Sequence, residues 1–279
     1  MSSTTKASVH HLDVALISSS PPRLAGRLSS IITFTGRALL KIKHAPEQMM
    51  DAFLYPAVFI LLFTYIFGGA IGGSPRDYLQ YAFPGIMCQL VLFMSMYTAI
   101  TVNTDFNKGV MDRFRSLPVW GPAYLVGALT ADILRYGVAM LLSLVAAMLI
   151  GYRPPGGFFG VVAAFGLVLV FTFALSWVWL IVGLKARTPT AVSGLATLVL
   201  FPLTFVSSAF VPQETVPGPL QVVIALNPIT VLIDTCRDLL DGNPALGGVL
   251  IVLGISVVLT GVLAPIALYI YRAGAGMAR

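Results

Sequence analysis

The feature that most constrains this chain is a series of long apolar segments that are free or nearly free of charge. Each is about as long as the ~20 residues that a helix needs to cross the ~30 Å apolar core of a bilayer. A membrane β-barrel would instead show segments of about ten residues with alternating polarity. We therefore predict an all-α polytopic membrane protein with six transmembrane helices, at residues 52–74, 81–102, 122–150, 158–184, 189–211 and 247–271.

Composition and charge agree with this interpretation. Charged residues make up only 10% of the chain, against about 25% in soluble domains, which is too few to cover a soluble surface. The net charge of +6 comes from Lys and Arg concentrated in alternate polar segments, a pattern that marks the cytoplasmic side. We expect a multi-pass protein of the cell membrane with both termini in the cytoplasm and with no nucleic-acid partner.

The first 48 residues contain no predicted span. Residues 1–24 are polar and are expected to form a disordered cytoplasmic tail, and residues 273–279 a second tail. Within residues 25–48, the sequence RLSSIITFTGRALLKIK predicts an amphipathic helix with Arg37 and Lys41 on its polar face. Such a helix lies in the membrane interface, either as a surface anchor or with a mechanical role. Its apolar face would carry Leu28, Ile31, Ile32, Leu39 and Ile42.

A short charged stretch, DFNKGVMDRFRSLP, occupies residues 105–118 between two spans. Asp105 is suited to cap a helix and Pro118 to end one. A helix here would place Phe106, Val110, Phe114 and Leu117 on one face. Two interpretations stay open: a solvated loop whose charges set the topology, or a docking helix for a cytoplasmic partner.

A second amphipathic segment, residues 216–242, lies on the predicted outer side. Asn227 followed by Pro228 is a favourable helix start, and Gly242 a favourable end. These features predict either a helical lid that dips into the outer leaflet or an ordinary outer loop. The apolar face would carry Ile229, Leu232, Ile233, Cys236, Leu239 and Leu240.

The only charges within a predicted span are Asp132 and Arg135, which share one helix face and can pair. Charges inside a membrane usually face the bundle interior or water. Their role is either structural pairing, near the inner boundary of the membrane, or a function in substrate or proton movement.

Several functional classes find no support in the sequence. All three histidines precede the first span, which excludes a histidine metal site or histidine catalysis within the membrane. A phosphate-binding GxxxxGK[ST] loop is also missing. We therefore expect a non-catalytic chain that binds no metal and no cofactor. Whether Cys88 and Cys236 form a disulfide stays open.

Four segments resemble signatures of the ABC-2 type permeases, closest to the daunorubicin-resistance DrrB group. They occur in the family's order, and the order and spacing match from about Arg27 to Arg272, nearly the whole chain. They are PEQMMDAFLYPAVFILLFTYIFGGAIGG (46–73), MDRFRSLP (111–118), PLTFVSSAFVP (202–212) and ALNPITVLIDTCRDLL (225–240).

The resemblance implies partners. In that family a separate ABC ATPase carries ATP and Mg, and two ATPases act with two permeases, here a homodimer or a related heterodimer among membrane lipids. Residues 49–272 would form the ABC-2 transmembrane domain, 25–48 the connecting helix and 105–118 the coupling helix. The ATPase-coupling residues would be Phe106, Lys108, Asp112, Arg113, Phe114 and Arg115.

The resemblance also implies a substrate path along the dimer interface, formed largely by spans two and five. Its lining would include Gln89, Phe93, Met94, Tyr97, Phe201, Thr204 and Phe205, although the same residues also suit helix packing. We expect export of a hydrophobic or amphipathic compound by alternating access. The alternatives are export of a lipid-linked glycan or another lipid, an ion-coupled carrier, and a membrane anchor or sensor without transport.

Overall fold

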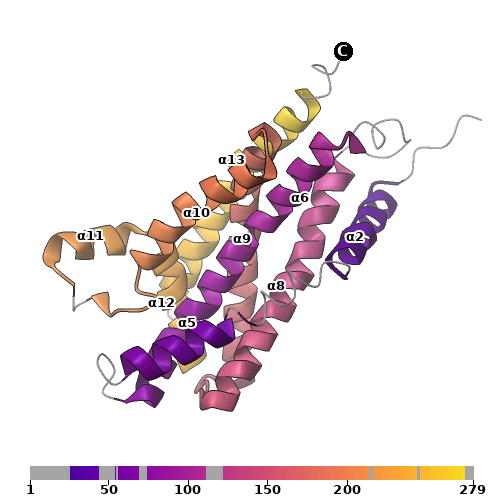
Figure 1. Cartoon of the computed structure of the whole chain (residues 1–279). Coiled ribbons are helices and arrows are strands. Elements are labelled where there is room, and N and C mark those ends of the chain that lie inside the picture. The colour runs from indigo at the N-terminus through magenta and orange to yellow at the C-terminus, as the bar shows by residue number, and fades with distance from the viewer. Residues whose placement is uncertain are drawn as a thin grey trace, which may run out of the picture.

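The computed structural model describes residues 26–43, 54, 56–68, 74–110, 122–213, 216–243 and 246–273. Every regular element within these residues is a helix, and the long helices run side by side in one bundle (Figure 1). The all-α class is therefore confirmed. The elements are α2 (Arg27–Lys43), a helix at Pro56–Ile66 that runs into the π-helix η1 (Phe63–Phe67), α5 (Pro75–Met94), α6 (Met96–Asn107), α8 (Ala123–Ile150), α9 (Gly157–Lys185), α10 (Pro189–Phe205), α11 (Gly218–Leu226), α12 (Pro228–Asp241) and α13 (Leu246–Ala273).

Four helical segments of the described residues are long and apolar enough to cross a membrane. They are Pro75–Asn107, which joins α5 and α6, and the helices Ala123–Ile150, Gly157–Lys185 and Leu246–Arg272. The pair α11 and α12 makes a fifth if it counts as one bent span. The helices at Pro56–Ile66 and α10 are apolar but shorter. The count of six spans therefore remains a prediction.

Local hydrogen bonds explain two helix boundaries that differ from those predicted. The second span begins at Pro75 rather than residue 81, because Ser74 Oγ accepts a hydrogen bond from the Asp77 amide at 3.1 Å and caps the helix. Helix α10 ends at Phe205 rather than continuing to residue 211. There the Asn227 side-chain amide donates to the carbonyls of Leu203 and Val206, both at 2.7 Å, and so satisfies groups that a helix end leaves free.

Helix α12 begins and ends where the sequence predicts. Asn227 Oδ1 accepts a hydrogen bond from the Ile229 amide at 2.9 Å, and Gly242 ends the helix with a φ of +81°, which favours glycine. The predicted apolar face is buried, and the helix packs against α9, α13 and α5. Helix α11 meets α12 at a bend of 80°. The role of this pair as a lid stays a prediction.

Helix α9 lies at the centre of the packing, with α6, α12 and α13 against it. Gly183 permits the close approach of α6, since a Cβ at this position would lie 2.6 Å from the Ala99 carbonyl oxygen. A smaller apolar cluster that includes Phe34, Tyr124, Trp177 and Tyr271 joins α2 to α8, α9 and α13. The amphipathic helix α2 is therefore packed onto the bundle.

Candidate coupling site

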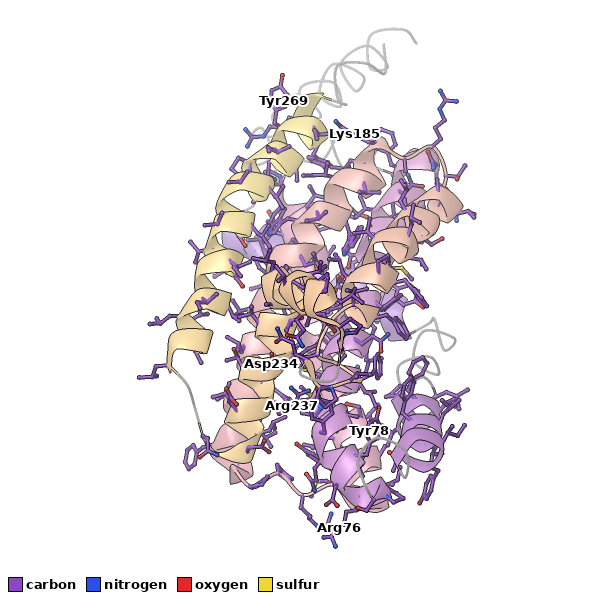
Figure 2. The ribbon with its side chains drawn as sticks, turned by 90° about the vertical axis from the view of Figure 1, so that its left-hand side faces the viewer. Arg76, Tyr78, Lys185, Asp234, Arg237 and Tyr269 are labelled. Atoms are coloured by element: carbon purple, nitrogen blue, oxygen red, sulfur yellow. The ribbon has the colours of Figure 1, made fainter. Side chains whose placement is uncertain are left out.

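The helix bundle has two ends that carry different residues. Figure 2 shows Lys185 and Tyr269 at one end and Arg76 at the other, with Asp234 and Arg237 between them and nearer Tyr78. The Lys185 end also holds the last turns of α6, because the side chain of Asn107 in α6 donates to the Arg187 carbonyl at 3.2 Å. Of the coupling residues predicted from the sequence, Phe106 lies in the last turn of α6 and the others follow it.

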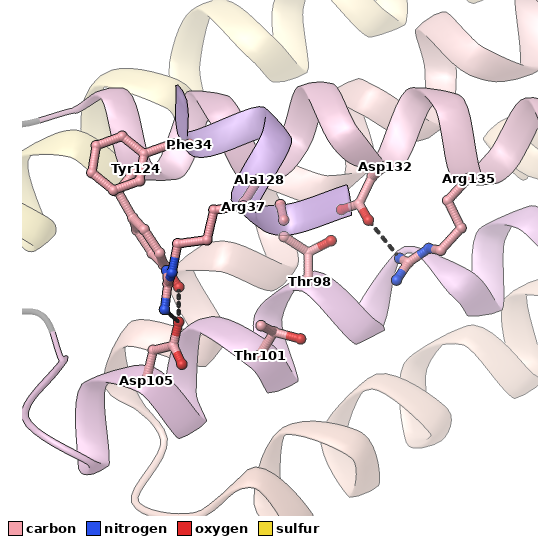
Figure 3. Close-up of a pocket in the computed structure, with 10 residues that line it drawn as sticks. Phe34, Arg37, Thr98, Thr101, Asp105, Tyr124, Ala128, Asp132 and Arg135 are labelled. Atoms are coloured by element: carbon pink, nitrogen blue, oxygen red, sulfur yellow. Dashed lines mark hydrogen bonds and ion pairs between the residues drawn. The ribbon is translucent and has the colours of Figure 1, made fainter. Parts of the chain in front are cut away.

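Asp105 is the centre of a polar cluster at the Lys185 end. Its Oδ2 atom accepts a hydrogen bond from the Tyr124 hydroxyl at 2.8 Å and lies 3.6 Å from Arg37 Nη2. Figure 3 shows the three side chains converging from α6, α8 and α2. A buried carboxylate is tolerated where such partners compensate its charge. We call Arg37, Asp105 and Tyr124 the Asp105 cluster.

The prediction that Asp105 caps a coupling helix is wrong. Helix α6 continues through Asp105 to Asn107, and the carboxylate contacts Tyr124 of α8 and Arg37 of α2. Gly109 follows with a φ of +67°, which interrupts a helix. Phe106 and Lys108 are exposed. Asp112, Arg113, Phe114 and Arg115 lie outside the described residues, so their coupling role stays a prediction.

The face of α2 that packs on the bundle carries Ser30 and Phe34, which are buried. Leu28 and Ile32 of the predicted apolar face are exposed, and their insertion into lipid stays a prediction. Arg37, predicted on the polar face, pairs with Asp105 of α6. Helical periodicity does not predict this ion pair, because it carries no information about a carboxylate on another helix.

Gly127 of α8 makes the close contact with α2 possible. A Cβ at Gly127 would lie 2.7 Å from the Cβ of Phe34. The Phe34 ring packs edge-on against Tyr124, with ring centroids 5.9 Å apart. The same contact therefore brings Arg37 and Tyr124 within reach of Asp105.

Asn103 is a site residue that the sequence reasoning missed. Its side-chain amide donates to the carbonyls of Gly183 at 2.9 Å and Ala186 at 2.7 Å. These carbonyls stand at the end of α9, where a helix leaves acceptors without partners. The stretch VNTDFN could have indicated this contact, because it places two Asn side chains at the end of an otherwise apolar span. Asn103 therefore ties α6 to α9.

A cavity of about 70 Å³ lies between α2, α6 and α8, lined by residues of all three helices. Figure 3 shows Asp105 with Arg37 on one side of it and Asp132 with Arg135 on the other. Oδ2 of Asp132 and the hydroxyl of Thr98 are buried without a hydrogen-bond partner among the described residues. The cavity is large enough to hold water, and water would satisfy such groups.

Asp132 and Arg135 form the ion pair that their spacing allows, with Arg135 Nη2 at 2.7 Å from Asp132 Oδ1. Both side chains are buried. Arg135 Nη2 also donates to the Met94 carbonyl at 3.1 Å, which the sequence did not predict. The pair thus contacts the middle of the second span as well as α8.

The seven residues predicted to line a substrate path do not share one surface. Phe201 and Phe205 of α10 are 52% and 38% exposed, and their rings stack with centroids 4.3 Å apart. Residues of the second span lie deeper. Phe93 and Tyr97 are partly buried. Gln89 and Met94 are buried, as is Thr204 on α10. In this conformation, a molecule on the surface of the chain cannot reach these three residues.

A second polar cluster lies towards the Arg76 end and holds the irregular segment 206–211 after α10. Arg237 pairs with Asp234 at 2.6 Å and donates to the Ser208 carbonyl at 3.0 Å. The Tyr81 hydroxyl donates to the same carbonyl at 2.9 Å. The Tyr78 hydroxyl donates to the Phe210 carbonyl at 3.0 Å. We call Tyr78, Tyr81, Ser208, Asp234 and Arg237 the Arg237 cluster.

The described residues contain no group of His, Cys, Asp or Glu that could hold a metal ion. Cys88 and Cys236 are buried and free. The two polar clusters hold together different parts of an apolar bundle: the Asp105 cluster joins three helices, and the Arg237 cluster holds segment 206–211.

Known proteins share this sequence pattern. Residues 29–240 match the family model described as ABC-2 type transporter. The chain is 42% identical over 270 residues to the daunorubicin resistance ABC transporter permease protein DrrB1 of Streptomyces coeruleorubidus, covering 97% of this chain and 95% of the relative. It is 23% identical over 234 residues to the probable doxorubicin resistance ABC transporter permease protein DrrC of Mycobacterium tuberculosis, covering 81% and 84%.

Another relative is the putative transport permease ycf38 of Cyanophora paradoxa, 22% identical over 217 residues, with 76% of this chain and 74% of the relative covered. The family model and the DrrB1 relative both extend over most of the bundle described above. The chain therefore belongs to the ABC-2 type transporter family, in the DrrB-like group of membrane permeases.

Proposed function

We propose that this chain is the membrane-spanning permease subunit of an ATP-driven ABC exporter that moves a hydrophobic or amphipathic compound out of the cytoplasm. Relatives named for resistance to daunorubicin and doxorubicin support a drug as that compound. The sequence has no phosphate-binding loop of the GxxxxGK[ST] type. ATP and Mg would accordingly bind to a separate ABC ATPase, in two copies that act with two permeases.

The observation that carries this proposal is the Asp105 cluster. It stands in the last turns of α6, directly before the segment that resembles a coupling helix. Through Arg37 and Tyr124 it joins α6 to α2 and α8, and Asn103 adds the end of α9. A displacement delivered by an ATPase to the segment after α6 would reach four helices together.

The Lys185 end of the bundle is the cytoplasmic end in this proposal. Basic residues lie at or just after the ends of helices there: Lys108, Lys185, Arg187 and Arg272. An excess of Lys and Arg marks cytoplasmic segments. The chain would then have both termini in the cytoplasm, and the Arg237 cluster would lie towards the outside.

The exposed face of α10 is the proposed side of the substrate path. Leu195, Leu198, Phe201 and Phe205 are exposed on this face, and a second permease copy that covers it would enclose a path between the copies. The rings continue inward, since Phe210 stacks on Phe205 at 5.2 Å and on Phe63 at 4.4 Å. Aromatic surfaces of this kind suit apolar or flat molecules.

An apolar hollow beside the end of α10 extends this surface. It has a volume of about 400 Å³, within the range of small-molecule sites. Its lining comes from the end of α10 and from α11 and its link to α12: Pro202, Leu203, Val206, Val223, Leu226, Asn227 and Pro228. Alternating access would open this region to each side of the membrane in turn.

The test is ATP hydrolysis by the purified permease, reconstituted in liposomes with the ABC ATPase that co-purifies with it. Daunorubicin is the probe. We expect it to stimulate hydrolysis and to accumulate in vesicles only when ATP is supplied. Stimulation by lipid extract but not by daunorubicin would replace the drug with a lipid as substrate. Uptake that needs an ion gradient and no ATPase would overturn the proposal.

A further inference from the structure

The run of regular helix in the second span is interrupted near its middle, although Ser95 keeps helical backbone angles (φ −62°, ψ −22°) and its amide still donates to the Val91 carbonyl at 3.1 Å. Helix α5 ends at Met94 and α6 begins at Met96, with Ser95 between them. The Ser95 hydroxyl donates back to the Leu92 carbonyl at 2.5 Å, a contact that bends helices. The break separates an outer part, which carries Gln89 and Phe93, from an inner part, which carries Tyr97 and ends at the Asp105 cluster.

Arg135 reaches this break from α8. Its Nη2 atom donates to the Met94 carbonyl at 3.1 Å, and the same atom lies 2.7 Å from Asp132. A side chain that inserts into the hydrogen-bond ladder of a helix is a recognised cause of a kink. The arginine is 5% exposed, so its contacts are with protein groups rather than with bulk water.

The surroundings of the guanidinium include two aromatic rings. Its carbon lies 5.4 Å from the centre of the Tyr136 ring on α8 and 5.7 Å from the centre of the Tyr97 ring on α6. These distances are within the range of cation–π attraction. Tyr97 is one of the residues predicted for the substrate path. Arg135 therefore contacts both sides of the break, Met94 before it and Tyr97 after it.

We propose that Arg135 is a positioning residue, which holds the break at Ser95 and sets the place of Tyr97 on the substrate path as the inner part of the span moves. The inference rests on the proposed export function and deepens it. Asp132 orients the guanidinium. The unpartnered Asp132 oxygen and the Thr98 hydroxyl face the cavity beside the break, which gives the inner part space to move.

A small tilt of the inner part of the span about a hinge at Ser95 would produce a larger displacement at Asp105. Asp105 lies ten residues beyond Ser95, a length of about 15 Å at ~1.5 Å per residue. A tilt of about 10° about Ser95 would displace the Asp105 end by about 2.6 Å, given that length. A displacement of that size is enough to rearrange the Asp105 cluster.

A plainer interpretation is that Asp132 and Arg135 only neutralise each other. Breaking a buried ion pair from one side is strongly destabilising, whereas replacing both partners is often tolerated. The plainer interpretation therefore predicts that the double variant Asp132→Asn/Arg135→Gln works like the wild type. If Arg135 positions the inner part of the span, the double variant should fold and assemble. Its daunorubicin binding should no longer stimulate ATP hydrolysis, because the variant lacks the guanidinium that bonds to the Met94 carbonyl.

The experiment compares wild type, Arg135→Lys and the double variant in liposomes with the co-purifying ATPase and daunorubicin. For the double variant we expect basal ATP hydrolysis within about twofold of wild type. Daunorubicin-stimulated hydrolysis should fall by about tenfold or more, since a small misplacement of positioning groups can reduce a rate by that factor. We also expect a change of about threefold in the half-saturating daunorubicin concentration, because Tyr97 is displaced. Arg135→Lys keeps the charge but not the forked guanidinium and should stay impaired.

The matched control is Arg153→Gln. Arg153 Nη1 also donates to backbone carbonyls, those of Met148 and Tyr152, both at 2.8 Å, at the opposite end of α8 from the Asp105 cluster. This variant should keep stimulated hydrolysis. Wild-type coupling in the double variant, or in Arg135→Lys, would overturn the hinge and leave the export function standing. A wild type without daunorubicin response would instead contradict the drug-export proposal.

A second measurement needs no substrate. Spin labels at Lys108 and Lys185, both exposed, report the separation between the ends of α6 and α9. We expect wild type to show two narrow distance populations, one without nucleotide and one with trapped nucleotide. The double variant should show one broad distribution in both states. Two narrow populations in the double variant would contradict a role of Arg135 in holding the break.

Discussion

The two polar clusters use the same residue types, Arg, Asp and Tyr, but hold different parts of the molecule. In the Asp105 cluster, side chains of three helices bond to one another, the ion pair is 3.6 Å long, and a cavity of about 70 Å³ lies beside it. In the Arg237 cluster, side chains bond to backbone carbonyls of segment 206–211, and the ion pair is 2.6 Å long. The first joins helices, whereas the second holds irregular backbone.

This difference follows from what each region must satisfy. Backbone carbonyls outside a helix need hydrogen-bond donors when they are buried in a membrane protein, so the Arg237 cluster is a requirement of the fold. The described contacts of the Asp105 cluster join side chains of three helices to one another, so we expect it to affect how the helices move together. We therefore expect variants of the Arg237 cluster to lose stability and variants of the Asp105 cluster to lose coupling.

The largest expected effect is that of Arg237→Leu. It removes donors from the Ser208 and Tyr81 carbonyls and leaves Asp234 without its counter-charge. We expect a loss of about 3 kcal/mol in stability, because two backbone carbonyls lose charged donors, whereas the ion pair itself, with its carboxylate 44% exposed, adds little. Thermal unfolding in detergent measures it. Arg76→Leu, an exposed change at the same end of the bundle, is the control, and equal losses in both variants would refute a special role for Arg237.

A pair of glycines tests the two regions directly. A Cβ at Gly85 would lie 2.5 Å from the Ala209 carbonyl oxygen, inside the segment that the Arg237 cluster holds. We expect Gly85→Ala to cost about 2–3 kcal/mol in unfolding free energy, as overpacking does. Gly127→Ala should cost about 1 kcal/mol or less, because α2 at the edge of the bundle can move away.

The glycine pair also separates stability from coupling. Gly127→Ala displaces α2, and with it Arg37, so the ATPase response to daunorubicin should fall although the protein stays folded. Chemical unfolding and stimulated hydrolysis measured on the same preparations would show this. If Gly127→Ala unfolded more easily than Gly85→Ala, the proposed difference between the two regions would be wrong.

Asp105→Asn should have a small effect on stability and a larger one on coupling. The Tyr124 hydroxyl can still donate to the Asn oxygen, and Arg37 is about one-third exposed, so the stability loss is about 1 kcal/mol. Loss of the ion pair loosens α2 from α6, and stimulated hydrolysis should fall by several-fold. Asp77→Asn, an exposed carboxylate at the Arg76 end, should leave coupling unchanged. Wild-type coupling in Asp105→Asn would remove the central support for the coupling site.

The smallest expected effect is that of Lys108→Glu, an exposed charge beyond the Asp105 cluster. We expect weaker association with the ATPase by less than about fivefold, because an exposed pair contributes at most about 1 kcal/mol. The effect should vanish at high salt, where charges are screened. Pull-down at two salt concentrations measures it, and a loss that persists at 1 M salt, where the Debye length is about 3 Å, would contradict an electrostatic contact.

The sequence alone determined the class of the protein and much of its order along the chain. Helix length and the absence of charge are local properties, and a bilayer imposes them on every spanning segment. The start of α12 at Asn227 and Pro228 and its end at Gly242 were likewise predictable, because capping involves only neighbouring residues. The spacing of Asp132 and Arg135 allowed their pairing for the same reason.

The tertiary structure alone decided which side chains meet. Arg37 and Asp105 are far apart in sequence, and nothing local predicts that α2 turns this arginine inward. The contact of Asn103 with the end of α9 depends on the close packing that Gly183 permits. Gln89 and Thr204 were assigned to a path by position in their spans, yet helix rotation buried both.

The contact between Arg135 and the Met94 carbonyl shows the same limit most clearly. A sequence records that an arginine is present, but it does not record which backbone carbonyl a neighbouring helix will present to it. That choice arises when α5, α6 and α8 pack, because a buried guanidinium takes the acceptors that packing brings within reach. Local rules determine the helices, and packing determines the contacts through which they act on one another.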